Sequence, residues 1–403
     1  MPVILFAVFI DLVGFGLIVP ILPFLTMAYG GDALSGTALI SIYSLMTFLS
    51  GPFWGRLSDK IGRRPALALT FAGGTLSYLT LAFSDSLAML FFARAMSGAM
   101  AGNIGVVMAA MADMTDAENR GRAMGWIGGV FGLGFAVGPG LGGWLGTGDG
   151  TVSILLPGLV AAGLAFTAML LTFFFVPETS PGHVASAASR GQEDTGDSSE
   201  PAPGSLSRRD LLFKSPWRFL LFLMFVVTAI GQSISFSITP FWAESTFGWT
   251  GSQVGVLLMA IGLCVAAVQT LAVGPLFRHL GEVRTISLGS IVSIAGCGLI
   301  MFGPSTPLVA ILGFPLVMGG LTVAFPALNS LVSLRTDRHN QGVALGMSQG
   351  LSALGRIVGP LSAGAVFSTS APGLPFVIVA ATAVIAGGWA FAEWRRDTPE
   401  NRS

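Results

Sequence analysis

The stretch Gly55-Arg-Leu-Ser-Asp-Lys-Ile-Gly-Arg-Arg-Pro65 decides the fold of this 403-residue chain. Five of its eleven residues are charged, whereas the segments on both sides are apolar. Each of those segments has about 20 residues, which is the length that crosses a bilayer as a helix. A charge-dense turn between them cannot lie in hydrocarbon. A short cationic loop between two spans therefore indicates a membrane protein and marks the side that faces the cytoplasm.

The composition supports this class, because the chain is 53% hydrophobic and only 10% charged. A soluble domain carries about 25% charged residues. At about 20 apolar residues per span, the sequence predicts an all-α membrane protein with twelve spans. They cover residues 3–27, 36–55, 65–84, 87–112, 123–145, 152–176, 217–241, 252–274, 285–303, 307–333, 343–367 and 374–394.

The cationic residues outside the predicted spans all fall on one side of the membrane. Of the 20 Lys and Arg, all except Arg94 and Arg356 lie in the even-numbered connections or at the ends of the chain. The charged residues of the odd-numbered connections are all acidic. By the positive-inside rule, we expect a multi-pass protein of the cell inner membrane with both termini in the cytoplasm.

The chain consists of two related halves. When it is shifted by 221 residues, Thr115–Gly143 aligns with Thr336–Gly364, and thirteen of the 29 positions are identical. Six helices are therefore duplicated in the same orientation. We predict an N-terminal bundle over 1–176, a flexible cytoplasmic linker over 177–216 and a C-terminal bundle with a short tail over 217–403. In transporters, such a duplication places the substrate between the halves near the midplane.

These motifs resemble the major facilitator superfamily, in its branch of 12-helix drug–proton antiporters. The stretch from Gly55 to Arg64 is similar to the signature of the family's second loop, and Asp11-Leu-Val-Gly-Phe-Gly16 to that of its first helix. Arg94-Ala-Met-Ser-Gly98 resembles the fourth-helix signature, and Gly134–Gly143 the fifth-helix antiporter signature. Met111–Arg120 is similar to tetracycline-efflux proteins, although those pumps carry other intramembrane residues where this chain has Thr47, Ser77, Cys264 and Ser293.

Ionisable side chains inside the spans are rare, and each costs about 2.5–3.5 kcal/mol to insert. Asp11 is the candidate for proton coupling, because burial raises the pKa of a carboxyl group and an approaching cation lowers it. The alternative is a carboxylate that is hydrogen-bonded to the backbone near Gly14. Arg94 is the candidate counter-charge of Asp11. It either pairs with Asp11 directly, or it binds backbone carbonyl groups and acts on Asp11 only through its electric field. Arg356 either attracts an anionic group of the substrate or anchors its helix.

The substrate cavity is predicted from polar residues on helices that face the centre in this family. The candidates are Asn103, Gln232 and Asn329, together with Arg356.

Two further sets of residues are candidates for conformational change. In the loop Gly55–Pro65, we expect a latch in which Asp59 accepts hydrogen bonds from a helix N-terminus across the interface between the halves, where the helix dipole favours an anion. A solvated loop is the alternative. Helix bends at two Gly-Pro pairs serve either packing or rocking. The residues of both sets are Gly55, Asp59, Gly62, Arg63, Arg64, Gly138, Pro139, Gly359 and Pro360.

The function that follows is secondary active transport and not enzymatic catalysis, because no nucleophile cluster, carboxylate pair or metal-ligand set occurs in the spans. We expect export of small amphipathic molecules in exchange for protons by alternating access. Proton-coupled uptake of a small metabolite is the alternative. No cofactor or metal is needed, since the proton motive force supplies the energy. The expected partners are the lipid bilayer, the small-molecule substrate and protons, with no nucleic acid, and the expected state is a monomer.

Overall fold

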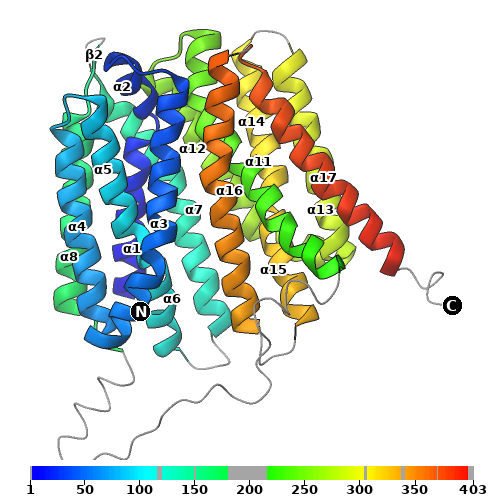
Figure 1. The fold of residues 1–403 in the computed structure, drawn as a ribbon, viewed down its shortest axis with the longest axis horizontal. Helices are drawn as coiled ribbons and strands as arrows, with labels where there is room; N and C mark the ends of the chain where they lie inside the picture. The colour runs from blue at the N-terminus through cyan, green and yellow to red at the C-terminus, as the bar shows by residue number, and fades with distance from the viewer. Residues whose placement is uncertain are drawn as a thin grey trace, which may run out of the picture. The chain divides into compact units, whose positions relative to one another are not determined.

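The structure is a computed structural model that describes residues 2–115, 120–148, 151–179, 216–303, 306–336, 341–369 and 371–397. These residues are almost entirely α-helical (Figure 1). Helices are expected here because, in hydrocarbon, each backbone N–H and C=O group needs a partner within its own segment. The predicted all-α membrane class is confirmed.

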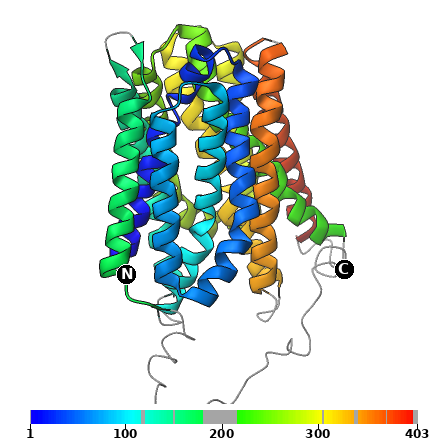
Figure 2. The same ribbon diagram turned by 60° about the vertical axis from the view of Figure 1, so that its left-hand side comes forward.

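The first half of the chain contains eight helices, a short 3₁₀ turn and one pair of two-residue strands within its described residues. Figure 2 shows these elements in dark blue to green. In chain order they are α1 (Pro2–Ile18), α2 (Leu22–Ala28), α3 (Ala33–Ile61), α4 (Arg63–Ala82), α5 (Leu87–Met100), η1 (Ala101–Asn103), α6 (Ile104–Asp113), α7 (Arg120–Gly146), β1 (Thr147–Gly148), β2 (Thr151–Val152) and α8 (Leu155–Phe175).

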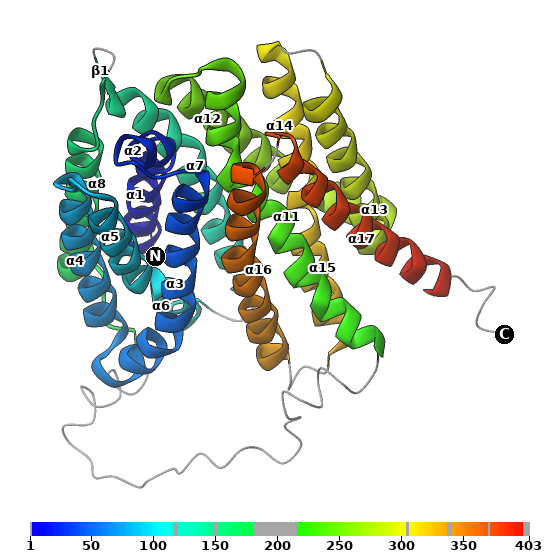
Figure 3. The same ribbon diagram turned by 45° about the horizontal axis from the view of Figure 1, so that its top comes forward.

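The second half, within the residues that the structure describes, contains longer helices and one π-helical turn. They are α11 (Pro216–Phe247), α12 (Gly251–Ala267), η2 (Val268–Ala272), α13 (Val273–Phe302), α14 (Pro307–Thr322), α15 (Ala324–Arg335), α16 (Gln341–Thr369) and α17 (Leu374–Asp397). Figure 3 shows α11 beside α16, and α13 beside α17.

Ten helical stretches of the described residues are long and apolar enough to cross a membrane. One of them, Gly251–Phe302, has 52 residues and contains Gly281, whose φ of 76° is not helical. The sequence predicts a boundary between two spans at this place. The count of twelve spans stays a prediction, whereas a multi-pass membrane protein is shown.

The chain divides into two compact units. Unit 1 contains Met1–Gly30, Ile42–Pro201 and Thr250–Met259, and unit 2 contains Gly31–Ser41, Ala202–Trp249 and Ala260–Ser403. The predicted linker lies outside the described residues except at its two ends. The predicted domain boundaries and the mobility of the linker stay predictions.

Each unit has its own apolar core. In unit 1, α1 packs against α7 and α8, and α4 packs against α8. Ile4, Leu67 and Met111 are buried in this core. In unit 2, α11 packs against α16 and α17, around Phe225 and Leu328.

Candidate functional site

Arg94 is the largest fully buried side chain of the described residues, with an exposed fraction of 1%. It lies on α5, and its guanidinium carbon is 4.5 Å from the ring centre of Tyr43 and 5.3 Å from that of Phe15. A desolvated cation over aromatic faces gains about 2 kcal/mol. Its Nε and Nη1 atoms have no hydrogen-bond partner among the residues that the structure describes. Two aromatic rings therefore hold this cation, a contact that neither of our two interpretations of Arg94 included.

A close approach of two helices places Arg94 against Tyr43. Gly98 lies one turn after Arg94, and a side chain at this position would collide with the backbone carbonyl of Tyr43. The glycine therefore lets α5 lie directly against α3. The fourth-helix motif Arg94-Ala-Met-Ser-Gly98 thus combines a buried cation with the residue that brings its aromatic partner close.

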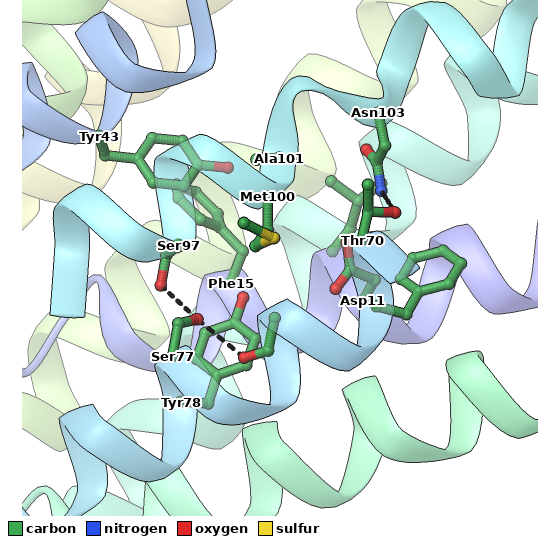
Figure 4. A pocket seen from close by; sticks show the side chains of 13 residues that line it. Asp11, Phe15, Tyr43, Thr70, Ser77, Tyr78, Ser97, Met100, Ala101 and Asn103 are labelled. Atoms are coloured by element: carbon green, nitrogen blue, oxygen red, sulfur yellow. Dashed lines mark hydrogen bonds between the residues drawn. The ribbon is translucent and has the colours of Figure 1, made fainter. Parts of the chain in front are cut away.

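Asp11 lies on α1 and lines a small cavity in unit 1 (Figure 4). The space available to the centre of a water molecule is about 30 Å³. This volume holds a water molecule but is far below the roughly 300–1,000 Å³ of drug-sized pockets. The cavity is lined by Asp11, Leu12, Phe15, Tyr43, Thr70, Phe71, Gly74, Ser77, Tyr78, Ser97, Met100, Ala101 and Asn103.

Polar side chains from α4 and from the α5–η1 segment are paired around this cavity. Ser97 Oγ donates to Ser77 Oγ at 2.8 Å, and Asn103 Nδ2 donates to Thr70 Oγ1 at 3.0 Å. Asn103 ends the 3₁₀ turn that interrupts the fourth predicted span. The break in the helix thus places an amide in the same cavity as the carboxyl group of Asp11.

Two tyrosines line the cavity together with Asp11. Tyr78 is buried there, and Tyr43 also lies under the guanidinium group of Arg94. Asp11 and Arg94 thus lie in the same unit, and Tyr43 is common to the cavity and to the surroundings of Arg94. Our sequence reasoning missed Tyr43 and Tyr78. The available signal was that two of the chain's three tyrosines lie inside spans.

The first cationic loop forms a polar network at the start of α4. Arg63 Nη1 is 2.6 Å from Asp59 Oδ1, and Arg63 Nε is 3.4 Å from Asp113 Oδ2 at the end of α6. Arg64 donates to the carbonyl of Phe173 on α8. Asp59 thus pairs within its own loop, and its predicted contact across the halves stays a prediction. Gly55 lies on α3, with open space where a side chain would stand.

The anion at a helix N-terminus is Glu178, which sequence reasoning missed. Its carboxylate accepts hydrogen bonds from the backbone N–H groups of Arg63 at 2.8 Å and Arg64 at 3.3 Å. Gly62, with a φ of 101°, turns the chain into α4, and a side chain there would collide with Glu178. The signal was an acidic residue in Val176-Pro-Glu-Thr179, directly after an apolar span.

The two Gly-Pro pairs occupy equivalent places in the two units. Gly138 packs against Gly16 of α1, and Gly359 packs against Ile230 and Ser233 of α11. Pro139 and Pro360 lie inside α7 and α16 respectively. Both pairs thus lie where two helices meet at short range, and their part in rocking stays a prediction.

The remaining cavity candidates lie in unit 2. Gln232 on α11 and Asn329 on α15 are half-buried, whereas Arg356 on α16 is exposed. Asn103, by contrast, is buried in the small cavity of unit 1. A joint substrate cavity formed by these four residues stays a prediction.

A duplicated bundle of membrane-spanning helices, with a half-buried acid in a polar cavity and a buried base in one bundle, defines a class of secondary transporter. The family model of the Major Facilitator Superfamily matches residues 4–360 and 222–403. The chain belongs to this superfamily, and it is a transporter and not an enzyme.

Curated relatives include drug resistance proteins. The tetracycline resistance protein of class B from Escherichia coli is 32% identical over 371 residues, which cover 90% of this chain and 87% of that protein. Multidrug resistance protein 2 of Bacillus subtilis is 28% identical over 367 residues, which cover 89% of this chain and 86% of that protein. Among solved structures, the human organic anion transporter MFSD10 is 25% identical with a TM-score of 0.69, covering 96% of this chain and 98% of that one.

Proposed function

We propose that this protein exports small amphipathic molecules in exchange for protons, and that Asp11 carries the proton. The observation that carries the proposal is the position of Asp11: a carboxyl group in a polar, water-sized cavity inside a membrane-spanning bundle that also contains Arg94. The names of the relatives, which include tetracycline and multidrug resistance proteins, support efflux.

The geometry supports an exchange of charge between two states. A buried guanidinium without a bound anion is costly in a low-dielectric interior. A deprotonated Asp11 adds a negative charge to the bundle that contains Arg94, whereas a protonated Asp11 leaves the charge of Arg94 without it. The cavity has room for a water molecule beside the carboxyl group, and such a water can pass a proton to Asp11. Loading and release of a proton thereby change the net charge inside the bundle.

The energy of one proton is sufficient for useful export. A proton that crosses 100 mV releases about 2.3 kcal/mol, and one pH unit adds about 1.4 kcal/mol. Together they sustain a substrate gradient of roughly 500-fold, since each 1.4 kcal/mol is a factor of ten.

The proposal names amphipathic molecules and not tetracycline itself. Where the tetracycline pumps that this chain resembles carry an acid in the third helix, this chain has Ser77, which pairs with Ser97. Ser293 is buried at the corresponding place in the ninth predicted span. The water-sized cavity of unit 1 is the proposed proton site, and it is too small by itself to hold a drug-sized substrate.

Inverted membrane vesicles test the proposal. With an acidic interior imposed, vesicles that contain the protein should accumulate one or more members of a panel of cationic, neutral and anionic amphipathic compounds. Asp11→Asn should abolish this accumulation while retaining substrate binding in detergent. Asp32→Asn is the matched control, since Asp32 lies outside the candidate spans. Accumulation by Asp11→Asn at the wild-type rate would refute the role of Asp11. Movement of the compounds out of the vesicles under the same acidic interior would refute export.

A further inference from the structure

One hydrogen bond in unit 2 joins two breaks in its helices. Gln269 lies in η2, the π-helical turn between α12 and α13, and its Nε2 donates to Oγ1 of Thr322 at 2.7 Å. Thr322 is the last residue of α14, where the tenth predicted span is interrupted before α15. Irregular backbone at membrane depth is tolerated where it lines a cavity or is buried in protein, and π-helical turns are frequent at functional sites. The pair Gln269 and Thr322 is called the glutamine site below.

Gln269 is exposed, but its side chain does not point toward the lipid. The exposed apolar face of this span contains Leu263 and Leu271, whose side chains are 51% and 73% exposed. Gln269 follows Leu263 by six residues, which turns its side chain about 120° away from that face at 3.6 residues per turn. The wider π-helical turn increases this angle. On the side to which Gln269 points, Ile261 is buried about two turns earlier. The carboxamide group is thus accessible on a side of the span other than the one that faces lipid.

The hydrogen bond to Thr322 orients the carboxamide group of Gln269. The hydroxyl of Thr322 is fixed by packing, because this side chain is 1% exposed. Helix α14 lies directly against η2, since a Cβ atom at Gly319 would be 3.7 Å from Cγ2 of Val268. A carboxamide has two N–H donors and a carbonyl acceptor, and the bond to Thr322 uses one donor only. The second N–H and the C=O group can therefore bind a ligand while Thr322 holds the first.

Unit 1 contains a related pair that differs in burial and in charge. Asn103, in the break between α5 and α6, donates to Thr70 at 3.0 Å (Figure 4). This amide is buried and lines the same cavity as Asp11. Residues 245–277 and 307–334, which contain the glutamine site, include no charged side chain. The pair in unit 1 thus belongs to an ionisable site, whereas the glutamine site offers only hydrogen bonds of uncharged groups.

We propose that the carboxamide of Gln269 binds an uncharged donor–acceptor group of the transported molecule, such as a primary carboxamide. Two carboxamides pair through the N–H group of each and the C=O group of the other. Thr322 is the sixteenth of the 29 residues of the span Pro307–Arg335, so the site lies near the middle of the membrane, where transporters bind their substrates. The proposal rests on the proposed transport of amphipathic molecules, but not on its direction or on its coupling to protons.

Equilibrium binding to the full-length protein in detergent tests the site without transport. The probes are naphthalene-2-carboxamide and methyl naphthalene-2-carboxylate, an ester of similar size that has no N–H donor. The carboxamide should bind about fivefold more tightly than the ester, which is the factor expected for one neutral hydrogen bond. Gln269→Leu should abolish this ratio. Thr322→Val keeps the carboxamide of Gln269 but removes the residue that orients it, and should reduce the ratio.

The matched control is Thr270→Val in the same π-helical turn. The hydroxyl of Thr270 donates to the carbonyl of Ala266 in its own helix at 2.7 Å, so this variant should keep the wild-type ratio. A loss of stability changes the affinity for both probes alike and leaves their ratio unchanged. Equal affinity of the wild type for both probes, binding of neither, an unchanged ratio in Gln269→Leu or an equal loss in Thr270→Val would overturn the proposal. An intact ratio in a protein that transports no compound in vesicles would refute the proposed function and support the site.

Cysteine labelling provides a second readout that needs no difference in affinity. In a protein that carries Cys264→Ala and Cys297→Ala, Gln269→Cys should react with a charged methanethiosulfonate reagent, and the carboxamide probe should slow this reaction. Leu263→Cys should not react, because the reactive thiolate does not form in hydrocarbon. Labelling of Leu263→Cys without labelling of Gln269→Cys, or labelling of Gln269→Cys that the probe does not slow, would overturn the proposal.

Discussion

Replacement of Gly138 by alanine tests whether the antiporter motif forms a rigid contact between α1 and α7. A Cβ atom at position 138 would stand 2.7 Å from Gly16 Cα and 2.8 Å from the carbonyl oxygen of Val13. Both are backbone atoms of α1, so no change of rotamer relieves the clash. The matched control is Gly129→Ala in the same helix, where a Cβ atom would meet nothing within 4 Å.

The expected magnitude follows from two opposing terms. Alanine in place of glycine stabilises a helix interior by about 1 kcal/mol, and this gain applies to both positions. Overpacking costs about 1–3 kcal/mol, and it applies only to Gly138. Gly138→Ala should therefore be about 1–3 kcal/mol less stable than Gly129→Ala. Gly359→Ala should fall between them, because its closest neighbour is the hydroxyl of Ser233, which can rotate.

The measurement is the free energy of unfolding of the purified protein, from reversible denaturation in mixed detergent micelles, together with transport by the same variants in vesicles. We expect the order of stability to be Gly129→Ala, then Gly359→Ala, then Gly138→Ala. If Gly138→Ala is as stable as Gly129→Ala, then α1 and α7 do not approach as closely as described. The packing reason for this glycine would then be wrong.

Two further predictions concern charges at helix ends outside the hydrocarbon. Glu178→Ala should lower the free energy of unfolding by about 1–2 kcal/mol, since it removes an acceptor and an anion from the N-terminus of α4. The control is Asp59→Ala, which should lower it by less than about 0.5 kcal/mol, because the side chain of Asp59 is 65% exposed. Equal losses in the two variants would contradict the capping role of Glu178. Hydrogen bonds from the amide and hydroxyl of Ser35 lower the pKa of Asp32 below its ordinary value of 3.8, so its contribution to stability is present above pH 3.8 and is lost as the pH falls through the lower folded-state value. Asp32→Ala should therefore lower the thermal midpoint at pH 6 by more than at pH 2.5, and an equal difference at both pH values would contradict this.

The class of fold could be predicted from the sequence because lipid imposes it. Apolar runs of about 20 residues must become helices, and the predicted boundary between residues 274 and 285 agrees with the non-helical Gly281. The interruptions inside spans were not predictable in the same way. The 3₁₀ turn at Ala101–Asn103 and the π-helical turn at Val268–Ala272 occur inside predicted spans and contain no proline. Each contains a polar residue with a tertiary hydrogen bond, from Asn103 to Thr70 and from Gln269 to Thr322.

The candidate site was predictable in its charged residues only. Asp11 and Arg94 are conspicuous because charges inside spans are costly, and the structure places both in unit 1. Their surroundings depend on which faces of α1, α3, α4 and α5 meet. The apolar and weakly polar sequence of these helices does not specify those faces, so the aromatic partners of Arg94 and the water-sized cavity became visible only in three dimensions.

The two loops that follow the second and eighth predicted spans keep one geometry while their charges differ. Gly62 and Gly281 end the same Gly-x6-Gly spacing, and both have a positive φ, of 101° and 76°. One residue later, Arg63 reaches Asp113 at the end of α6, and Glu282 accepts from Ser330 of α15.

In both units, the residue after the glycine thus contacts the helix that completes the fourth or the tenth predicted span. A basic residue makes this contact in unit 1 and an acidic residue makes it in unit 2. The backbone turn is a requirement of the fold, since it must reverse the chain outside the hydrocarbon in each bundle. The sign of the charge is not such a requirement, because the ion pair of Arg63 and the hydrogen bond to Glu282 both connect the residue after the glycine to the neighbouring helix. The turn of the chain therefore does not depend on the charges of the loop Gly55–Pro65, and this is the loop in which we predict the latch.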